Sequence, residues 1–541
     1  MDAAVNPNRE FTIKELIYYA YFAIMLIAKG FGLYQGQKLY TLALAVSALL
    51  IAFKILSTKH TLYEWAAMIL LCAMAAMIYL NSNEIGALII VATIIGMKDV
   101  PVKRIMAVGA VLWTFTFFVR MLTTLLHLNR DIFKVQNKFH LGFIVRWSLG
   151  QPHPNVLQIS FILFCAFILY FGRFKGLKLY LVSALMLLGN LYIFLYSFSV
   201  TGIMLAVIYL GLNIYLTDFR KKHGRTDSLY PVEKWAFIGL VPVCALLSVL
   251  GPVVLKGRAW EFFNNLFNTR FNIALEYMRA NPITLFGTGY CNELPPELNN
   301  LDCAYVFALM HYGIIFFVLF IAGYTLLVYH QIKNDRRIEL AITISMCIAA
   351  ISEPFLVNPS FKNITWIFIG ELMYMGLGRL NELHLLPGFG VFKIGDNIAD
   401  IPADKILNMG KRIGETYTRM PRIIFATSIM IGVLAGCLYA DMKQMPNAYY
   451  MNRDSVQVWD NGITLDINNL PEDFDGKILE YTDSETIMYR IDGNAVTMEY
   501  IRGIVSMIVW GFALTALVMG ITITIIVNKD YKVKNEDRTE V

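Results

Sequence analysis

The residues best able to do chemistry gather in two polar loops of an otherwise apolar chain. The first loop ends in RWSLGQPHPN and holds Arg146, His153 and Asn155 directly before a long apolar stretch. Two prolines bracket the histidine and restrict its backbone, and such a fixed turn suits a side chain that must be aimed. A proline-rich helix start with Asn155 near its cap would account for the same residues without chemistry.

The second loop, 256–303, carries the arginines Arg258, Arg270 and Arg279. A guanidinium offers a planar fork of donors that matches phosphate oxygens, and it keeps its charge at any working pH. Arginines at this place therefore suggest the binding of a diphosphate headgroup. The alternative is an amphipathic surface helix at 258–280 whose arginines are simply solvated.

Asp302 and Tyr305 lie where this loop returns to apolar sequence. An aspartate there could be a general base toward a hydroxyl group, or it could cap the following helix. Cys291 and Cys303 could pair if the loop faces an oxidising compartment. The turn LFGTGY, at 285–290, lacks the lysine of a nucleotide-binding loop.

A third cluster, ISEPFLVNPSFKN, places Glu353 and Asn358 near the ends of two apolar stretches. A carboxylate beside a proline there either contacts a substrate or is structural. Neither cysteine of the second loop sits in a metal-site spacing, and no metal or cofactor is expected. The sequence has no basic stripe with interleaved aromatics, which argues against nucleic acid as a partner.

Membrane helices must position these residues. Of the 541 residues, 57% are hydrophobic and 16% are charged, whereas soluble domains carry about 25% charged residues. Apolar runs of about 17–25 residues recur along the chain, and each is long enough to cross a bilayer. We therefore predict an all-α polytopic membrane protein with about fourteen transmembrane helices. The predicted spans are approximately 15–34, 38–56, 62–80, 85–97, 104–126, 154–172, 178–196, 199–217, 235–255, 304–329, 338–356, 363–379, 422–440 and 501–527.

The lysines and arginines of the short loops predict the orientation, because cytoplasmic loops are enriched in them. Basic loops recur at 98–104, 172–178, 218–225 and 333–337. The loops that alternate with them are nearly free of positive charge. The basic loops and both termini are therefore predicted to be cytoplasmic. The long segments 127–153, 256–303 and 441–500 are then predicted to lie outside.

The predicted organisation changes near residue 380. Residues 1–380 form a transmembrane core of about twelve spans, 381–421 form a cytoplasmic amphipathic linker, and 422–541 form a two-span module. Within this module, 441–500 holds period-two runs separated by turn residues, which predict a small extracellular, mainly β domain. Its acidic character suits a solvated surface better than a phosphate site, so we expect a modulatory or docking role.

Together these motifs resemble the O-antigen polymerase and ligase family, in particular the Wzy-like polymerases of capsule and exopolysaccharide pathways of Gram-positive type. The matching features come in the family's order and cover about residues 15–380. They are RWSLGQPHPN before a span, KGR at the start of the large loop, LFGTGY within it, LDCAY at its exit with MHYGII in the next span, and SEPFLVNPSFKN near the end of the core.

The resemblance implies a multi-pass cell-membrane glycosyltransferase that needs no metal and whose active site is extracellular or periplasmic. It would transfer a glycan from undecaprenyl diphosphate to a lipid-linked acceptor repeat unit. The implied partners are undecaprenyl-diphosphate-linked oligosaccharides, membrane lipid, and flippase and chain-length regulator proteins. The family's arginines bind the diphosphate, which maps onto Arg146, Arg258 and Arg270.

The remaining site residues follow from the clusters already described. His153 and Asp302 are the candidate general bases, and His153 is preferred because an imidazole titrates near neutral pH. The further substrate contacts expected are Asn155, Tyr305, Glu353 and Asn358.

Three other functions are compatible with the same composition. The related ligases place a histidine in the large loop, and none occurs here between 256 and 303, which favours a polymerase over a ligase. A flippase for lipid-linked glycans needs polar lining in both halves of the bundle, whereas here the notable polar residues cluster on one side. A non-enzymatic assembly scaffold is the third alternative.

Overall fold

The computed structural model divides the chain into two compact units. Unit 2 contains Thr12–Ile132 and Ser148–Ile398, and unit 1 contains Met1–Phe11, Phe133–Trp147 and Ala399–Val541. The residues described are 11–126, 128, 131, 133–137, 143–219, 229–267, 269–289, 301–357, 363–384, 388–391, 398–399, 421–443, 445, 449–452, 456–460, 463–464, 476–483, 486–491 and 493–539.

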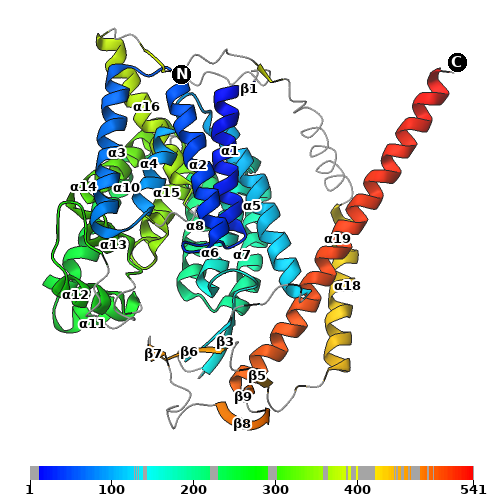
Figure 1. Ribbon diagram of the computed structural model, residues 1–541. Coiled ribbons are helices and arrows are strands. Elements are labelled where there is room, and N and C mark those ends of the chain that lie inside the picture. Colours follow the sequence, from blue (N-terminus) through cyan, green and yellow to red (C-terminus); the bar gives the residue numbers. More distant parts are fainter. Residues whose placement is uncertain are drawn as a thin grey trace. The chain divides into compact units, whose positions relative to one another are not determined.

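Unit 2 is a bundle of helices (Figure 1). Its helices before the first long loop are α1 (Ile13–Gly30), α2 (Lys38–Ser57), α3 (Leu62–Ser82), α4 (Gly86–Ile95) and α5 (Val102–Leu125). Those that follow are α6 (Pro154–Gly172), α7 (Leu177–Ser197), α8 (Val200–Ile214), the π-helical turn η1 (Tyr215–Phe219), α10 (Pro231–Val254), α11 (Gly257–Leu266), α12 (Arg270–Ala280), α13 (Ala304–His311), α14 (Gly313–Lys333), α15 (Arg337–Ala349), the 3₁₀ turn η2 (Pro354–Leu356) and α16 (Thr365–His384). The two-residue strands β1 (Phe11–Thr12) and β4 (Ile398–Ala399) lie at the borders of the units.

Local sequence explains where several helices begin. Thr61 caps α3 in a capping box, because its side chain accepts from the Glu64 backbone N–H while the Glu64 carboxylate accepts from the Thr61 backbone N–H. Ser199 caps α8 by accepting from the Gly202 N–H. Both α6 and α10 begin with proline, whose fixed φ suits the first helical position.

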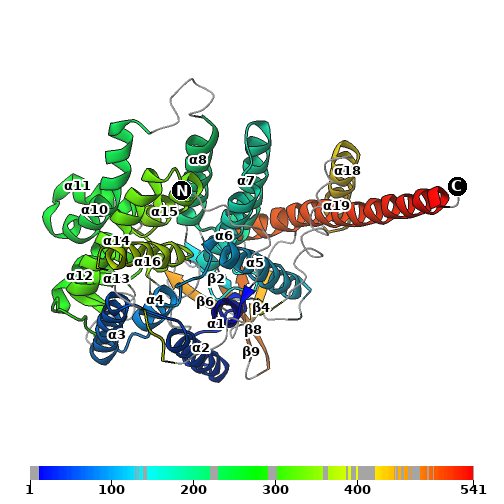
Figure 2. The same ribbon diagram turned by 90° about the horizontal axis from the view of Figure 1, so that it is seen from above.

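The short helix α15 is enclosed by other helices of the bundle. It packs against α8, α10, α14 and α6 (Figure 2). Most of its 13 residues are buried, including polar ones such as Thr343 and Ser345. These two hydroxyls donate to backbone carbonyls one turn earlier, which satisfies them inside an apolar environment. Because α15 is surrounded by other helices, its C-terminal end is held firmly, and that end contributes to the site described below.

Ten helices of the described residues are long and apolar enough to cross a membrane. The chain is therefore a multi-pass membrane protein. The predicted spans 15–34, 85–97, 338–356 and 363–379 correspond to α1, α4, α15 and α16, which are not among the ten. Helices α4 and α15 have only 10 and 13 residues, and α1 carries Lys14, Glu15 and Lys29. The count of fourteen spans stays a prediction.

The predicted span 304–329 is built from two helices rather than one. α13 ends at His311 and α14 begins at Gly313, whose φ of +84° no side chain adopts easily. The chain bends there because the segment 284–288 hydrogen-bonds across the junction. The Thr288 N–H donates to the Met310 carbonyl at 2.8 Å, and the Ile314 N–H donates to the Thr284 carbonyl at 3.0 Å.

Unit 1 combines two helices with two small sheets. The helices are α18 (Pro421–Met442) and α19 (Asn494–Thr539), and the strands are β2 (Phe133–Asn137), β3 (Phe143–Trp147), β5 (Tyr449–Asn452), β6 (Val456–Asp460), β7 (Ile463–Thr464), β8 (Gly476–Asp483) and β9 (Thr486–Ile491). α18 packs closely on α19 because Gly432 and Gly436, spaced as GxxxG, face Ile508. A Cβ atom on Gly432 would lie 2.6 Å from the Ile508 carbonyl oxygen.

The division into units differs from the predicted domains in one respect. β2 pairs antiparallel with β3, and it also pairs parallel with β6, where Phe133 lies opposite Val456. Residues 133–147, predicted to belong to the core, therefore share a sheet with the segment predicted as a separate β domain. Of the predicted linker 381–421, most residues lie outside the described part of the chain. Within unit 2, Phe389 pairs with His60 through two backbone hydrogen bonds of 2.8 and 2.9 Å.

Candidate functional site

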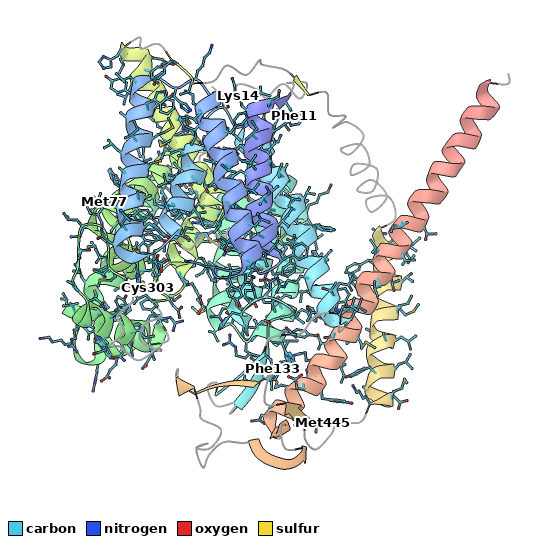
Figure 3. All side chains as sticks on the ribbon, in the orientation of Figure 1. Phe11, Lys14, Met77, Phe133, Cys303 and Met445 are labelled. Carbon is cyan, nitrogen blue, oxygen red and sulfur yellow. The ribbon has the colours of Figure 1, made fainter. Side chains whose placement is uncertain are left out.

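Four segments of unit 2 that are far apart in the sequence meet at one end of the bundle. They are the start of α6, the start of α12, the residues directly before α13, and the turn after α15. Cys303, labelled in Figure 3, marks the position of the α13 start. Three side-chain contacts connect the four segments to one another. Each contact involves a residue from one of the sequence motifs described above.

Arg270 connects three of these segments. Its Nη2 atom lies 2.5 Å from Oδ2 of Asp302, and its Nε–H donates to the Ser352 carbonyl at 3.3 Å. The Arg270 side chain retains 14% exposure and that of Asp302 retains 38%. The ion pair is therefore partly buried but still open to solvent on the aspartate side. Such a pair contributes little net stabilisation to the fold, since the desolvation of both charges offsets much of their attraction.

Asp302 does not cap α13, which was one of its two predicted roles. The N-cap position belongs to Cys303, and no side chain caps the helix there. The Ala304 N–H instead donates to the Ala350 carbonyl at 2.9 Å, which fixes the start of α13 on the end of α15. Asp302 thus projects from a rigid backbone toward Arg270.

Asn155 connects α6 with the turn after α15. Its Nδ2–H donates to Oε1 of Glu353 at 3.2 Å. The Glu353 side chain is buried, with 4% of the residue exposed. A buried carboxylate requires hydrogen-bond donors, because its desolvation is otherwise costly. Ser352 and Glu353 are neighbours in the chain, so the Asn155 contact and the Arg270 contact lie on consecutive residues.

His153 is the N-cap of α6, with Pro154 at the first helical position. Its Nδ1 atom accepts from the Asn155 N–H at 3.0 Å. An imidazole nitrogen that accepts carries no proton, so the neutral ring holds its proton on Nε2 and acts there as a donor. The sequence allowed an interpretation in which this segment is simply a proline-rich helix start with Asn155 near the cap. The segment does start a helix, but His153 and not Asn155 is the capping residue. The half-buried imidazole ring is connected to the site because Asn155, whose backbone it contacts, also contacts Glu353.

Each of the other predicted site residues has its own environment. Arg146 is buried in β3 and belongs to unit 1, opposite Lys134 of β2. Arg258 is exposed in the first turn of α11. Tyr305 is fully buried and its hydroxyl donates to the Cys347 carbonyl at 2.8 Å, as expected of a packing residue. Asn358 lies outside the described residues.

The glycine turn LFGTGY has a structural role that its sequence did not reveal. Gly287 has a φ of +82°, and a Cβ atom on it would collide with the His311 carbonyl oxygen. Gly313 faces it with positive φ, and a Cβ there would collide with the Gly287 nitrogen and the Leu285 carbonyl oxygen. His311 connects the junction to the turn and to α12. Its Nδ1 lies 3.0 Å from the Thr288 carbonyl oxygen, and its Nε2 lies 3.1 Å from the Tyr277 hydroxyl. The two glycines permit two backbones to touch, which stiffens the loop beside α12.

Cys303 is a free thiol and 5% exposed, so the structure gives it no disulfide partner. Burial raises the pKa of this thiol. Cys291 lies outside the described residues. Among the residues described between 11 and 539, no group of three or more histidine, cysteine, aspartate or glutamate side chains could hold a metal ion.

Sequence reasoning found Arg270, Asp302, Asn155, Glu353 and His153 but missed how they pair. It also missed the Ser352 carbonyl, because a backbone acceptor leaves no trace in residue type. The assembled site offers one arginine, one accessible carboxylate and one imidazole donor on a rigid frame. Such a set can bind an anionic oxygen group and accept a proton beside it. Comparison of the chain with models of protein families, with curated proteins and with solved structures finds no match.

Proposed function

We propose that this protein is a glycan polymerase that transfers a glycan from undecaprenyl diphosphate to a hydroxyl of a lipid-linked acceptor repeat unit. The observation that supports the proposal is the contact chain from His153 and Asn155 through Glu353 to Arg270 and Asp302. These residues come from separate motifs that resemble the polymerase family, and they meet at one end of a membrane-spanning bundle.

The chemistry needs two things from the protein. Breaking the anomeric C–O bond leaves negative charge on the diphosphate, and the acceptor hydroxyl loses a proton as it attacks. Arg270 supplies a fixed cation for the diphosphate, and preorganised donors of this kind contribute about 2.7–4 kcal/mol each to transition-state stabilisation. His153 supplies an Nε2–H donor to the diphosphate or to the donor sugar.

Asp302 is the better candidate for the general base. His153 was preferred on its titration range, but its Nδ1 atom already accepts the Asn155 N–H, so its outward nitrogen carries a proton. Glu353 is buried and bound by Asn155. Asp302 is the more exposed carboxylate, and its pairing with Arg270 places the proton acceptor beside the diphosphate-binding cation.

The proposed orientation follows the charged loops and places this end of unit 2 outside the cell. Both termini are then cytoplasmic. Cysteine probes at Glu261 and Asn265, which are exposed on α11, should react with a membrane-impermeant reagent in intact cells. Probes in 218–225 should react only after the membrane is opened. The reverse pattern would place the site in the cytoplasm and remove the lipid-linked donor from its reach.

The decisive assay uses the purified full chain with synthetic undecaprenyl-diphosphate-linked repeat units and a metal chelator. A ladder of products that differ by one repeat unit supports the polymerase. Movement of the lipid-linked unit across a vesicle membrane without elongation would identify a flippase. Transfer of a finished glycan to an unlike acceptor without a ladder would identify a ligase.

The segment 441–500 is proposed to modulate product length or to dock a chain-length regulator. It belongs to unit 1, whose strand β6 also pairs with β2. A chain truncated after residue 398 should therefore lose this sheet while unit 2 keeps its own contacts. Continued elongation with an altered length distribution supports modulation, whereas complete loss of transfer in a stably inserted truncate would make unit 1 part of the catalytic machinery.

A further inference from the structure

The ten-residue helix α11 has an apolar face that no part of the described chain covers. Ala259, Phe262 and Leu266 recur at helical spacing, all three are exposed, and none of the helix's residues is buried. Phe262 is 61% exposed and Leu266 is 49% exposed. Glu261 and Asn265, four residues apart and both exposed, form the polar face.

The rest of α11 is firmly attached to unit 2. The Phe263 ring stacks on Phe267 at 5.9 Å and on Phe271 of α12 at 6.0 Å between centroids. The Trp260 indole N–H donates to the Pro252 carbonyl of α10 at 3.3 Å. The exposed face therefore belongs to a fixed helix, and its direction is set by α10 and α12.

The exposed face of α11 follows directly on an exposed apolar surface at the end of α10. α10 is one of the helices long and apolar enough to cross the membrane. At its last turn Leu250, Val253 and Val254 are 49%, 54% and 65% exposed. Because α10 is long and apolar enough to span the bilayer, exposed valines at its end are suited to contact with acyl chains, and α11 begins three residues after Val254.

The charges next to this face suit lipid headgroups. Lys256 and Arg258 are both exposed and lie between the end of α10 and the apolar residues of α11. Basic residues at this level are attracted to the phosphates of anionic phospholipids. A protein partner is a poorer fit, because stable protein interfaces bury about 1,200–2,000 Å² and a ten-residue helix is only about 15 Å long.

We propose that α11 is an interfacial helix that binds the bilayer leaflet next to the site. Phe262 and Leu266 enter the acyl boundary, and Lys256 and Arg258 contact the phosphates of anionic phospholipid. Because Phe263 stacks on Phe271, the residue after Arg270, this binding also fixes the level of the Arg270–Asp302 pair relative to the membrane surface. The inference concerns lipid alone and does not depend on the proposed polymerase activity.

The test is to measure nitroxide depth on the full chain reconstituted in vesicles of phosphatidylethanolamine and phosphatidylglycerol. Single cysteines at 262 and 266 sample the apolar face, and single cysteines at 261 and 265 sample the polar face of the same helix. The accessible native cysteines are replaced by serine in each variant. Interfacial helices lie about 5–10 Å into the headgroup and acyl boundary. Probes at 262 and 266 should therefore collide several-fold more often with oxygen than with a water-soluble nickel chelate, and probes at 261 and 265 should show the reverse.

The matched charge variants Phe262→Glu and Asn265→Glu provide a second measurement with a probe at 266. Phe262→Glu should raise the nickel collision rate at 266, because a carboxylate at 262 draws the face toward water. Asn265→Glu adds the same charge to the polar face, and it should leave the nickel collision rate at 266 nearly unchanged. Equal nickel access at all four probe positions would overturn the proposal. So would dipolar broadening at 262, which indicates a second copy, or protection of 262 from both reagents, which indicates a bound protein segment.

Discussion

Arg270 at the start of α12 and Asp302 directly before α13 form an ion pair with 2.5 Å between Nη2 and Oδ2. The pair joins α12, which lies within the large polar loop 256–303, to the end of that loop, and the Arg270 contact with the Ser352 carbonyl ties the pair to the turn after α15. Each partner has a separate role in the proposed reaction, so the pair can be tested by removing one role at a time.

We expect Asp302→Asn to abolish elongation while the lipid-linked donor still binds. The amide keeps the size of the side chain but cannot accept a proton. Arg270→Lys keeps the charge but loses the fork, and Arg270→Ala loses both. Arg270→Ala should therefore lower kcat/KM by about 10²–10³, and Arg270→Lys should lower it less. Initial rates with a synthetic donor and donor binding by the inactive Asp302→Asn protein are the measurements.

Donor binding separates a base from a positioning residue. If Asp302 is the base, Asp302→Asn should bind the lipid-linked donor as the wild type does while elongation is lost. Clearly weaker donor binding in Asp302→Asn would show that Asp302 positions Arg270 for the diphosphate. Arg279→Ala is the matched control, because the Arg279 side chain is 65% exposed and, among the described residues, its ion pair is with Glu276 of the same helix.

The hydrogen bond between Asn155 and Glu353 should support stability. Asn155→Leu leaves the buried Glu353 carboxylate without that donor, and hydrogen bonds to charged groups contribute about 1.5–3 kcal/mol. Asn155→Asp instead places two carboxylates near each other, which raises the pKa of one of them. Its melting temperature should therefore approach the wild-type value near about pH 4, where a carboxyl group protonates, and should fall below it as the pH rises to neutrality.

The double variant Asn155→Asp, Glu353→Gln is the control for this prediction, since it restores one neutral and one charged partner. It should lose the pH dependence. Thermal unfolding in detergent, followed by size-exclusion chromatography, measures both effects. A melting temperature of Asn155→Asp that is independent of pH would show that the two side chains do not interact in solution.

The glycines at the junction of α13 and α14 should not tolerate alanine. A Cβ atom on Gly287 or Gly313 would meet backbone atoms, and both residues have positive φ. Strained backbone positions cost about 1–3 kcal/mol each, and the backbone collision adds to this. Gly287→Ala and Gly313→Ala should therefore lower the melting temperature clearly.

Gly289→Ala is the matched control in the same turn. A Cβ atom there would have the Ser82 carbonyl oxygen 3.6 Å away, which is ordinary contact. Its melting temperature should stay close to the wild-type value. If Gly287→Ala were equally stable, the contact between the turn and the α13–α14 junction would not exist in solution.

The Cys303 thiol should be unreactive in the folded protein. Burial raises its pKa, so the thiolate that reacts with maleimide is scarce and also inaccessible. Maleimide should label Cys303 only after denaturation in detergent, and raising the pH from about 7 to about 8.5, the pKa of an ordinary thiol, should not change this. Peptide mass spectrometry identifies the site, with Cys303→Ser as the control. A peptide with Cys291 and Cys303 linked by a disulfide would contradict the structure.

Hydropathy alone determined that this is a multi-pass membrane protein, because a helix in lipid must satisfy its backbone internally and so appears as a long apolar run. It identified ten of the helices that the structure describes as able to cross the membrane. It could not settle α4 and α15, which are short and enclosed by other helices rather than by lipid. Charge in the loops predicted an orientation, and the motifs selected His153, Asp302 and Glu353.

Only the tertiary structure decided how those residues combine. Asn155 and Glu353 are 198 residues apart, and nothing in their spacing indicates a hydrogen bond. The β2 pairing with β6 joins segments even farther apart, and these strands are too short for a strong alternating pattern. The tautomer of His153, in contrast, follows from a local contact with the Asn155 N–H two residues away. Residue type shows which groups can react, but the contacts that direct Asp302 and Glu353 arise only when distant segments pack together.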